Sequence, residues 1–199
     1  MKKIFQLLQL KFRGYLVIDN FFPEEVALNL RKLALSQYCV NEIYPDGYKA
    51  SDFDNESIFK MDSRCISLVV KKLPILKNTE YFRSWSFVYE NVCRGVGPHA
   101  DPSVYNVNIW VTPTDSVEDC QKNGIILFKK FAHPSMTWEQ YNSDINLIEK
   151  YLKDSKRVKI PYRFNRAVIF PGKMFHTTDF VHMKPGDWNK RINYTFLFK

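Results

Sequence analysis

A series of short β-type segments between residues 84 and 198 constrains the fold of this chain more than any other feature. These segments are rich in branched and aromatic residues, and Gly, Pro, Asn and Asp separate them, as is typical of strands joined by turns. They are SWSFVYENVC (84–93), VYNVNIWV (104–111), GIILFKKF (124–131), RVKIPY (157–162), RAVIFP (166–171) and RINYTFLF (191–198). The pattern predicts a β-sandwich or a jelly roll.

Helical patterns precede and interrupt these strands. After a short strand at Tyr15 to Ile18, the segment 23–35 begins with Pro and two Glu and then repeats apolar residues at helical spacing. A second helix is expected over 63–73 and an inserted amphipathic helix over 135–155, while 37–63 lacks a sustained period and is expected to be mostly loop. The predicted class is α+β, mainly β: a jelly roll with N-terminal supporting helices and one inserted helix.

The length of 199 residues and the apolar content of 45% suit a single domain over 1–199. Four cysteines lack the spacing of a zinc module, and a chain of this size does not need disulfides. The start, MKKIFQLLQLKF, lacks a small-residue cleavage site, and no run approaches membrane-spanning length. We therefore expect a cytoplasmic protein with reduced thiols and no membrane partner.

The net charge of +8 would attract an anionic partner of any kind. However, lysines are spread from Lys2 to Lys199, and no dense basic stripe with interleaved aromatic residues is present. A nucleic-acid partner is therefore permitted by the charge but not favoured.

The segment GVGPHADPSVYNVNIWVTP (95–113) places a histidine and an aspartate two residues apart, just before a strand. In an extended chain His99 and Asp101 point to the same side, so both can approach one metal ion. Pro98 and Pro102 cannot donate to a central strand ladder, which places the pair at a strand end. The ordinary alternative is a turn in which the histidine bonds a loop carbonyl and the aspartate caps the turn.

A metal site needs a third ligand, and His176 is the best candidate. It ends AVIFPGKMFH, in which an apolar strand turns at a Pro-Gly pair and presents a histidine from a second strand. His133 and His182 lie in polar segments and are expected to be solvated. Two imidazoles and one carboxylate are the ligand set of non-haem Fe(II) oxygenases, with positions left open for a co-substrate and O₂.

Arg191 begins the last predicted strand, downstream of His176. A guanidinium fixed at the base of a barrel can bind a carboxylate with two parallel hydrogen bonds. Such an arginine would anchor the far end of a dicarboxylate whose other end chelates the iron. Lys184 is a nearer cation, but it lies in a loop-like Pro/Gly segment, so Arg191 is preferred.

The order HAD, FPGKMFH and then an arginine resembles the Fe(II)- and 2-oxoglutarate-dependent dioxygenases, in their prolyl-hydroxylase-like branch. The segments YLVIDNFFPEEVALNLR (15–31) and NGIILFKK (123–130) are similar to elements of that branch. The resemblance implies a double-stranded β-helix, Fe(II) on His99, Asp101 and His176, and 2-oxoglutarate and O₂ as co-substrates. Arg191 lies farther beyond His176 than is usual in the family, since VHMKPGDWN (181–189) is inserted.

Further side chains are expected near the co-substrate. Tyr89 stands where that branch often places a tyrosine, although its alternation with Phe87 also fits a core aromatic residue. Asn106 and Asn108 share one strand face, which lines the pocket or faces solvent, and we assign Asn108 to the cofactor-binding set. The segment 177–179 (Thr-Thr-Asp) is expected to orient His176.

The expected activity is hydroxylation of a C–H bond in a protein side chain, an amino acid or a small metabolite, with release of succinate and CO₂. The elements expected to contact the substrate are 37–63 and the helix around Trp138 to Leu152. A non-catalytic cupin-like jelly roll that binds a metal, and a basic nucleic-acid-binding protein, are the alternatives. The oligomeric state stays open.

Overall fold

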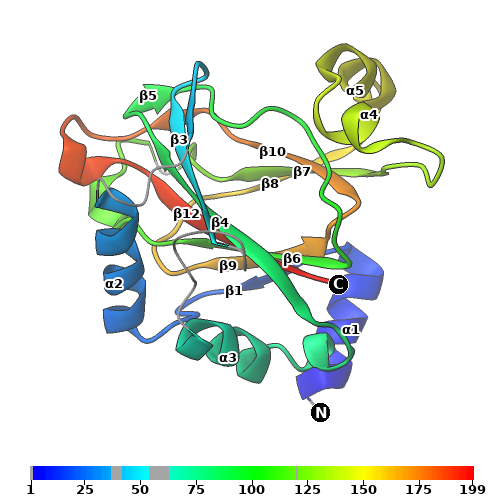
Figure 1. Cartoon of the computed structure of the whole chain (residues 1–199), viewed down its shortest axis with the longest axis horizontal. Coiled ribbons are helices and arrows are strands. Elements are labelled where there is room, and N and C mark those ends of the chain that lie inside the picture. The colour runs from blue at the N-terminus through cyan, green and yellow to red at the C-terminus, as the bar shows by residue number, and fades with distance from the viewer. Residues whose placement is uncertain (1, 37–41, 54–62, 120) are drawn as a thin grey trace.

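The computed structural model describes residues 2–36, 42–53, 63–119 and 121–199. In this part the chain is mostly β, with few helices and with antiparallel sheets (Figure 1). The largest sheet has seven strands in the order β1 (Leu16–Ile18), β9 (Ala167–Pro171), β6 (Tyr105–Trp110), β12 (Ile192–Phe198), β4 (Tyr81–Tyr89), β3 (Tyr48–Phe53) and β2 (Glu42–Tyr44). The smaller sheets are β10 (Met174–Thr178), β7 (Ile125–Phe131) and β8 (Arg157–Ile160), and the pair β11 (Val181–His182) and β5 (Val92–Cys93).

Neighbouring residues on the central strands face opposite sides of the seven-stranded sheet, and residues two apart share a side. On β6, Val107 and Ile109 join the apolar core under the helices, whereas Trp110 packs with residues of the three-stranded sheet. On β12, Tyr194 and Phe196 likewise join the core under the helices. The intervening positions of β6 and β12 therefore point between the two sheets, because side chains alternate along a strand.

Helices cover the outer face of the large sheet. Both α2 (Glu24–Leu35) and α3 (Ser63–Lys72) contribute buried apolar residues to this core, as expected from their helical spacing. Pro23 precedes α2, and acidic residues occupy its first turn, where they suit the positive end of the helix dipole. The helix α1 (Lys2–Arg13) was not predicted from the sequence.

The inserted segment forms two helices, so the prediction of a single helix over 135–155 was wrong. A capping box between Thr137 and Gln140 starts α4 (Trp138–Asn142). The side chain of Asp144 then accepts a hydrogen bond from the Leu147 amide and starts α5 (Ile145–Leu152). The aspartate that interrupts the periodic pattern is thus a helix cap.

The prediction that 37–63 is mostly loop was wrong for the hairpin β2–β3, which extends the large sheet by pairing with β4. The parts 37–41 and 54–62 of that prediction lie outside the described residues. No helix among the described residues is long and apolar enough to cross a membrane.

Candidate metal centre and dicarboxylate pocket

The three predicted ligands meet between the two larger sheets. His99 and Asp101 lie on the segment before β6, and His176 lies on β10. The backbones of His99 and His176 pair, with N–H to carbonyl distances of 3.0 and 2.9 Å. This pairing keeps the segment extended, so His99 and Asp101 share one side while the intervening Ala100 packs into a separate apolar cluster.

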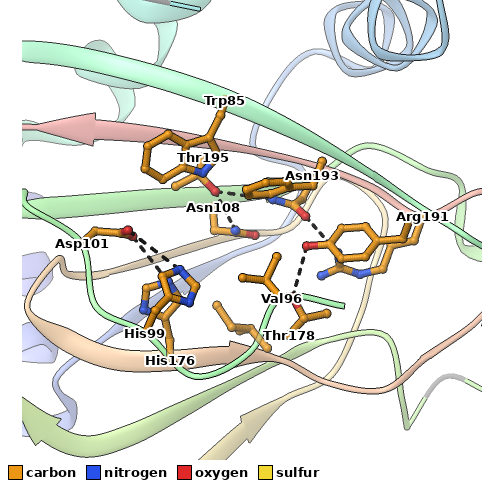
Figure 2. Close-up of a pocket in the computed structure, with 13 residues that line it drawn as sticks. Trp85, Val96, His99, Asp101, Asn108, His176, Thr178, Arg191, Asn193 and Thr195 are labelled. Atoms are coloured by element: carbon orange, nitrogen blue, oxygen red, sulfur yellow. Dashed lines mark hydrogen bonds and ion pairs between the residues drawn. The ribbon is translucent and has the colours of Figure 1, made fainter. Parts of the chain in front are cut away.

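The three side chains converge on one point. Each offers one ligand atom, and these atoms all lie within 4.8 Å of one another. Nε2 of His99 lies 3.8 Å from Oδ1 of Asp101, and Nε2 of His176 lies 3.5 Å from Oδ2 (Figure 2). Among the described residues this is the group of His, Cys, Asp and Glu side chains with the spacing to hold a metal ion.

Backbone carbonyls fix the orientation of both imidazole rings. Nδ1 of His99 lies 2.8 Å from the carbonyl of Gly97, and Nδ1 of His176 lies 3.1 Å from the carbonyl of Met174. A carbonyl only accepts hydrogen bonds, so each Nδ1 must carry the proton and each Nε2 keeps a free lone pair. Burial and the neighbouring His99 hold the pKa of His176 well below its usual value, which keeps that ring neutral.

The two oxygens of the Asp101 carboxylate have different surroundings. Oδ2 accepts a hydrogen bond from the side-chain amide of Asn106, whose own oxygen accepts from the hydroxyl of Ser103. Oδ1 is buried and has no hydrogen-bond partner within the described part of the chain. Burial raises the pKa of Asp101, and the nearby His99 opposes this shift. A buried carboxylate oxygen without a donor is costly for a fold, and a bound cation would satisfy it.

A turn and the inserted helices hold the backbone of the ligand segment. The amide of Asp101 donates to the carbonyl of Gly172 at 2.8 Å, and a Cβ at Gly172 would overlap with Ser103. The amide of Ala100 donates to the carbonyl of Tyr141, and the Asn142 side chain donates to the carbonyl of Ala100 at 3.1 Å. The turn before β10 and helix α4 therefore both position the segment that carries two of the three candidate ligands.

Arg191 lies in the same pocket, directly before β12, and only 2% of it is exposed. Its guanidinium donates to the carbonyl of Asn123 at 2.6 Å and to the side-chain oxygen of Asn193 at 2.9 Å, and it lies 4.4 Å from the centre of the Tyr89 ring. None of the described carboxylates forms an ion pair with it. A buried guanidinium that meets only neutral acceptors and an aromatic face suits an anionic ligand.

The pocket connects the metal-ligand cluster with Arg191 (Figure 2). The hydroxyl of Tyr89 lies 3.1 Å from that of Thr178, and the amide of Asn108 donates to Thr195 while its oxygen has no described partner. Free space in the pocket is about 20 Å³, roughly the room for one water molecule. A ligand larger than a water molecule would therefore require the lining side chains to move. The lining consists of Trp85, Phe87, Tyr89, Val96, His99, Asp101, Asn108, Ile125, His176, Thr178, Arg191, Asn193 and Thr195.

The structure thus brings together in one pocket the six residues that the sequence assigned to metal or cofactor binding: His99, Asp101, His176, Arg191, Tyr89 and Asn108. Lys184 does not line the pocket, and its amide bonds the carbonyl of Ser116. His133 contacts Ser135, and His182 lies on β11.

The expectation for 177–179 was wrong, because these side chains have other partners. The hydroxyl of Thr177 donates to the carbonyl of Val96, and Asp179 pairs with Lys159 at 2.8 Å.

Sequence reasoning missed Trp85, Asn193 and Thr195. All three follow from strand alternation, since Asn193 and Thr195 continue the face begun by Arg191, and Trp85 shares a face with Tyr89.

No protein-family profile and no curated protein sequence matches the chain. Solved structures do match. A prolyl-4-hydroxylase from Pseudomonas putida aligns over 100% of this chain and 98% of its own, with 11% identity and a TM-score of 0.61. The carbocyclase SnoK of nogalamycin biosynthesis, described as non-haem and α-ketoglutarate dependent, aligns over 97% and 82% with 12% identity and a TM-score of 0.64. HygX from Streptomyces hygroscopicus, solved with nickel and 2-oxoglutarate bound, aligns over 97% and 85% with 8% identity and a TM-score of 0.59.

The chain therefore has the fold of the 2-oxoglutarate- and Fe(II)-dependent oxygenases, and it places a His-Asp-His cluster inside that fold.

Proposed function

We propose that this chain is an Fe(II)- and 2-oxoglutarate-dependent oxygenase with a single catalytic domain over 1–199. The observation that carries the proposal is that one pocket holds a buried carboxylate oxygen without a hydrogen-bond donor and a buried guanidinium without a counter-charge. Oδ1 of Asp101 has no described donor, and the Asp101 carboxylate lies beside the Nε2 atoms of both imidazoles. The buried guanidinium of Arg191 has no described carboxylate partner. A bound cation would satisfy the carboxylate oxygen, and a bound dicarboxylate would supply the counter-charge of the guanidinium.

The architecture supports this proposal. We assign the facing sheets to a double-stranded β-helix, in which β10 and the segment before β6 bring the ligands together from distant parts of the chain. The relatives by fold include an oxygenase solved with nickel and 2-oxoglutarate. The helices α2 and α3 support the outer face, which keeps the inner face free for the site.

The donor set fits Fe(II). Nε2 of His99, Nε2 of His176 and Oδ1 of Asp101 would hold the ion, since two imidazoles and one carboxylate leave other positions open. When bound, Fe(II) supplies the site where 2-oxoglutarate and O₂ react, with succinate and CO₂ as products. The protein's own contribution is to keep both rings in the tautomer with Nε2 free, and to keep Asp101 in place through Asn106.

The other pocket residues would bind 2-oxoglutarate. Arg191 would take the carboxylate remote from the metal, and the hydroxyl of Tyr89 and the amide of Asn108 would donate to the co-substrate. The aromatic side chains of Tyr89 and Trp110 lie near the guanidinium and exclude water from it. A dry environment strengthens the ionic contact with a carboxylate.

We favour hydroxylation of a C–H bond, with a protein side chain, an amino acid or a small metabolite as substrate. The relatives by fold include a prolyl-4-hydroxylase but also a carbocyclase and an epimerase, so fold alone does not choose the outcome. A non-catalytic jelly roll would use the same ligands for a metal but would have no need for a buried arginine in the pocket.

The role of Arg191 is tested by binding. Arg191→Gln should weaken 2-oxoglutarate binding by about tenfold or more, because each charge-assisted hydrogen bond contributes about 1.5–3 kcal/mol. Calorimetric titration of metal-loaded protein with 2-oxoglutarate measures this loss, and Arg191→Lys should restore part of the affinity. Equal affinity of wild type and Arg191→Gln would contradict the assignment.

A further inference from the structure

The helix α1 turns an apolar face outward. Ile4, Phe5, Leu8 and Phe12 are 63%, 61%, 46% and 79% exposed, respectively. Ile4, Leu8 and Phe12 follow one another at intervals of four residues, so they form one stripe along the helix. Apolar side chains gathered on one exposed face mark an interaction surface, whereas single ones do not.

The opposite face of α1 attaches the helix to the body of the protein. Gln6 is buried, and its side-chain amide donates to the carbonyl of Lys72 at 3.1 Å. Leu10, four residues later, packs against the core under the helices. The outward direction of the apolar stripe is therefore fixed by packing, and α1 lies at the edge of the molecule, away from α2 and from the inserted helices (Figure 1).

The charges around the stripe are positive. The helix KKIFQLLQLKFR contains no acidic residue, and Lys11 and Arg13 in its last turn are exposed. Lys129 lies at the same end, where its ammonium group donates to the carbonyl of Arg13. Lys156 is exposed and adjoins Lys129 through a backbone hydrogen bond of 2.8 Å.

The exposed apolar stripe of α1 and the cations around it together indicate which kind of partner this face can bind. In a two-fold contact through this face, α1 would pack on a second α1 and bring cations together with no acidic residue on either helix, in a chain of net charge +8. A bilayer with anionic lipids offers both an apolar interior for Phe and Leu and negative charge for Lys and Arg.

We propose that α1 docks this protein on the surface of a membrane that contains anionic lipid. The helix would lie in the plane of the interface, with Ile4, Phe5, Leu8 and Phe12 among the acyl chains and Lys11 and Arg13 at the head groups. The proposal differs from the expectation of no membrane partner, which rested on the lack of a spanning segment. The proposal does not depend on the catalytic function.

Cosedimentation with lipid vesicles tests the proposal. The full chain should bind vesicles of phosphatidylcholine and phosphatidylglycerol, bind pure phosphatidylcholine vesicles much more weakly, and lose affinity as salt is raised. Phe12→Gln should reduce binding to the anionic vesicles about tenfold, since it removes an apolar side chain from the interface. Lys11→Glu should reduce it severalfold.

Matched control variants distinguish binding through α1 from nonspecific binding through any exposed apolar or basic residue. Ile43→Gln removes an apolar side chain of similar exposure, 74%, on β2, and Lys153→Glu changes an exposed lysine after α5. Both should bind vesicles like the wild type. Loss of binding in these controls equal to that in Phe12→Gln and Lys11→Glu, or no binding of the wild type to anionic vesicles, would overturn the proposal. A concentration-dependent dimer that Phe12→Gln dissociates would instead assign the face to a second copy.

Discussion

At the scale of single residues, the carboxylate of Asp101 is the most informative group. One oxygen is held by Asn106, and the other has no donor among the described residues. A carboxylate arranged in this way is fixed in orientation yet keeps one free acceptor for a cation. Asn106 should matter for metal binding as Asp101 does, because the hydrogen-bond partners of metal ligands orient those ligands.

Asn106 can be tested against its neighbour on the same strand face. Asn106→Leu should weaken metal binding about 10–100-fold, since it removes the donor that holds Asp101. Asn108→Leu is the matched control, because Asn108 is also buried but bonds Thr195. Anaerobic titration of the metal-free protein with Fe(II) measures both. If both variants bound metal like the wild type, the role of Asn106 in holding the carboxylate would be wrong.

The three side chains that converge in the pocket could be predicted from the sequence, whereas the contacts that hold them could not. His99 and Asp101 are two apart in an extended segment, and His176 and Arg191 each adjoin a strand in the required order. The hydrogen bond from Asn106 depends on how the chain folds back between 101 and 106, and that path has no sequence signal. Trp85, in contrast, could have been found by extending the alternation from Tyr89.

At the scale of elements, the turn between β9 and β10 positions the ligand segment. The carbonyl of Gly172 accepts a hydrogen bond from the amide of Asp101, and a Cβ at Gly172 would overlap with Ser103. The sequence signalled a turn at Pro171–Gly172 but not this contact, because it depends on tertiary packing.

Gly172→Ala should therefore destabilise the protein by about 1–3 kcal/mol, as overpacking does, and should also weaken metal binding. Gly97→Ala is the matched control on the same ligand segment, since a Cβ there would lie 3.6 Å from Ile145, an ordinary contact. Denaturant unfolding measures both variants. A loss of stability in Gly172→Ala no larger than in Gly97→Ala would show that the turn tolerates a side chain.

Helices and strands whose apolar residues recur at regular spacing were predicted from the sequence. Elements that form by pairing with distant parts of the chain were not. The strands from 84 onward and the helices α2 and α3 follow the sequence pattern. The hairpin β2–β3 was not predicted because its polar, Gly-containing sequence resembles a loop. It forms strands in the structure, where β3 pairs with β4. The inserted helix divided because Asp144 forms a cap.

At the scale of the whole molecule, the fold buries ionisable groups in one pocket and gives none of the described ones there a full set of partners of opposite charge. Asp101 and His176 are buried, and so is Arg191. Burying such groups lowers the free energy of unfolding of the protein without ligands. Ligands that bind the folded state raise it.

Metal binding should therefore raise the thermal unfolding midpoint. At a concentration of Fe(II) about 100 times its Kd, linkage gives about 2.7 kcal/mol of added stability. Anaerobic thermal melts with and without Fe(II) measure the shift, and chelation should reverse it. Asp101→Ala should show little or no shift. An equal shift in that variant would place the metal elsewhere.

We propose that the His-Asp-His cluster performs 2-oxoglutarate-dependent oxygen chemistry. The most direct test is succinate production by purified, iron-loaded protein with 2-oxoglutarate and O₂, in wild type, Asp101→Ala and His176→Ala. We predict slow succinate formation by the wild type even without a second substrate, and none by either variant. Succinate formed equally by all three proteins, or by none of them even when candidate peptides, amino acids and metabolites are supplied, would contradict the account.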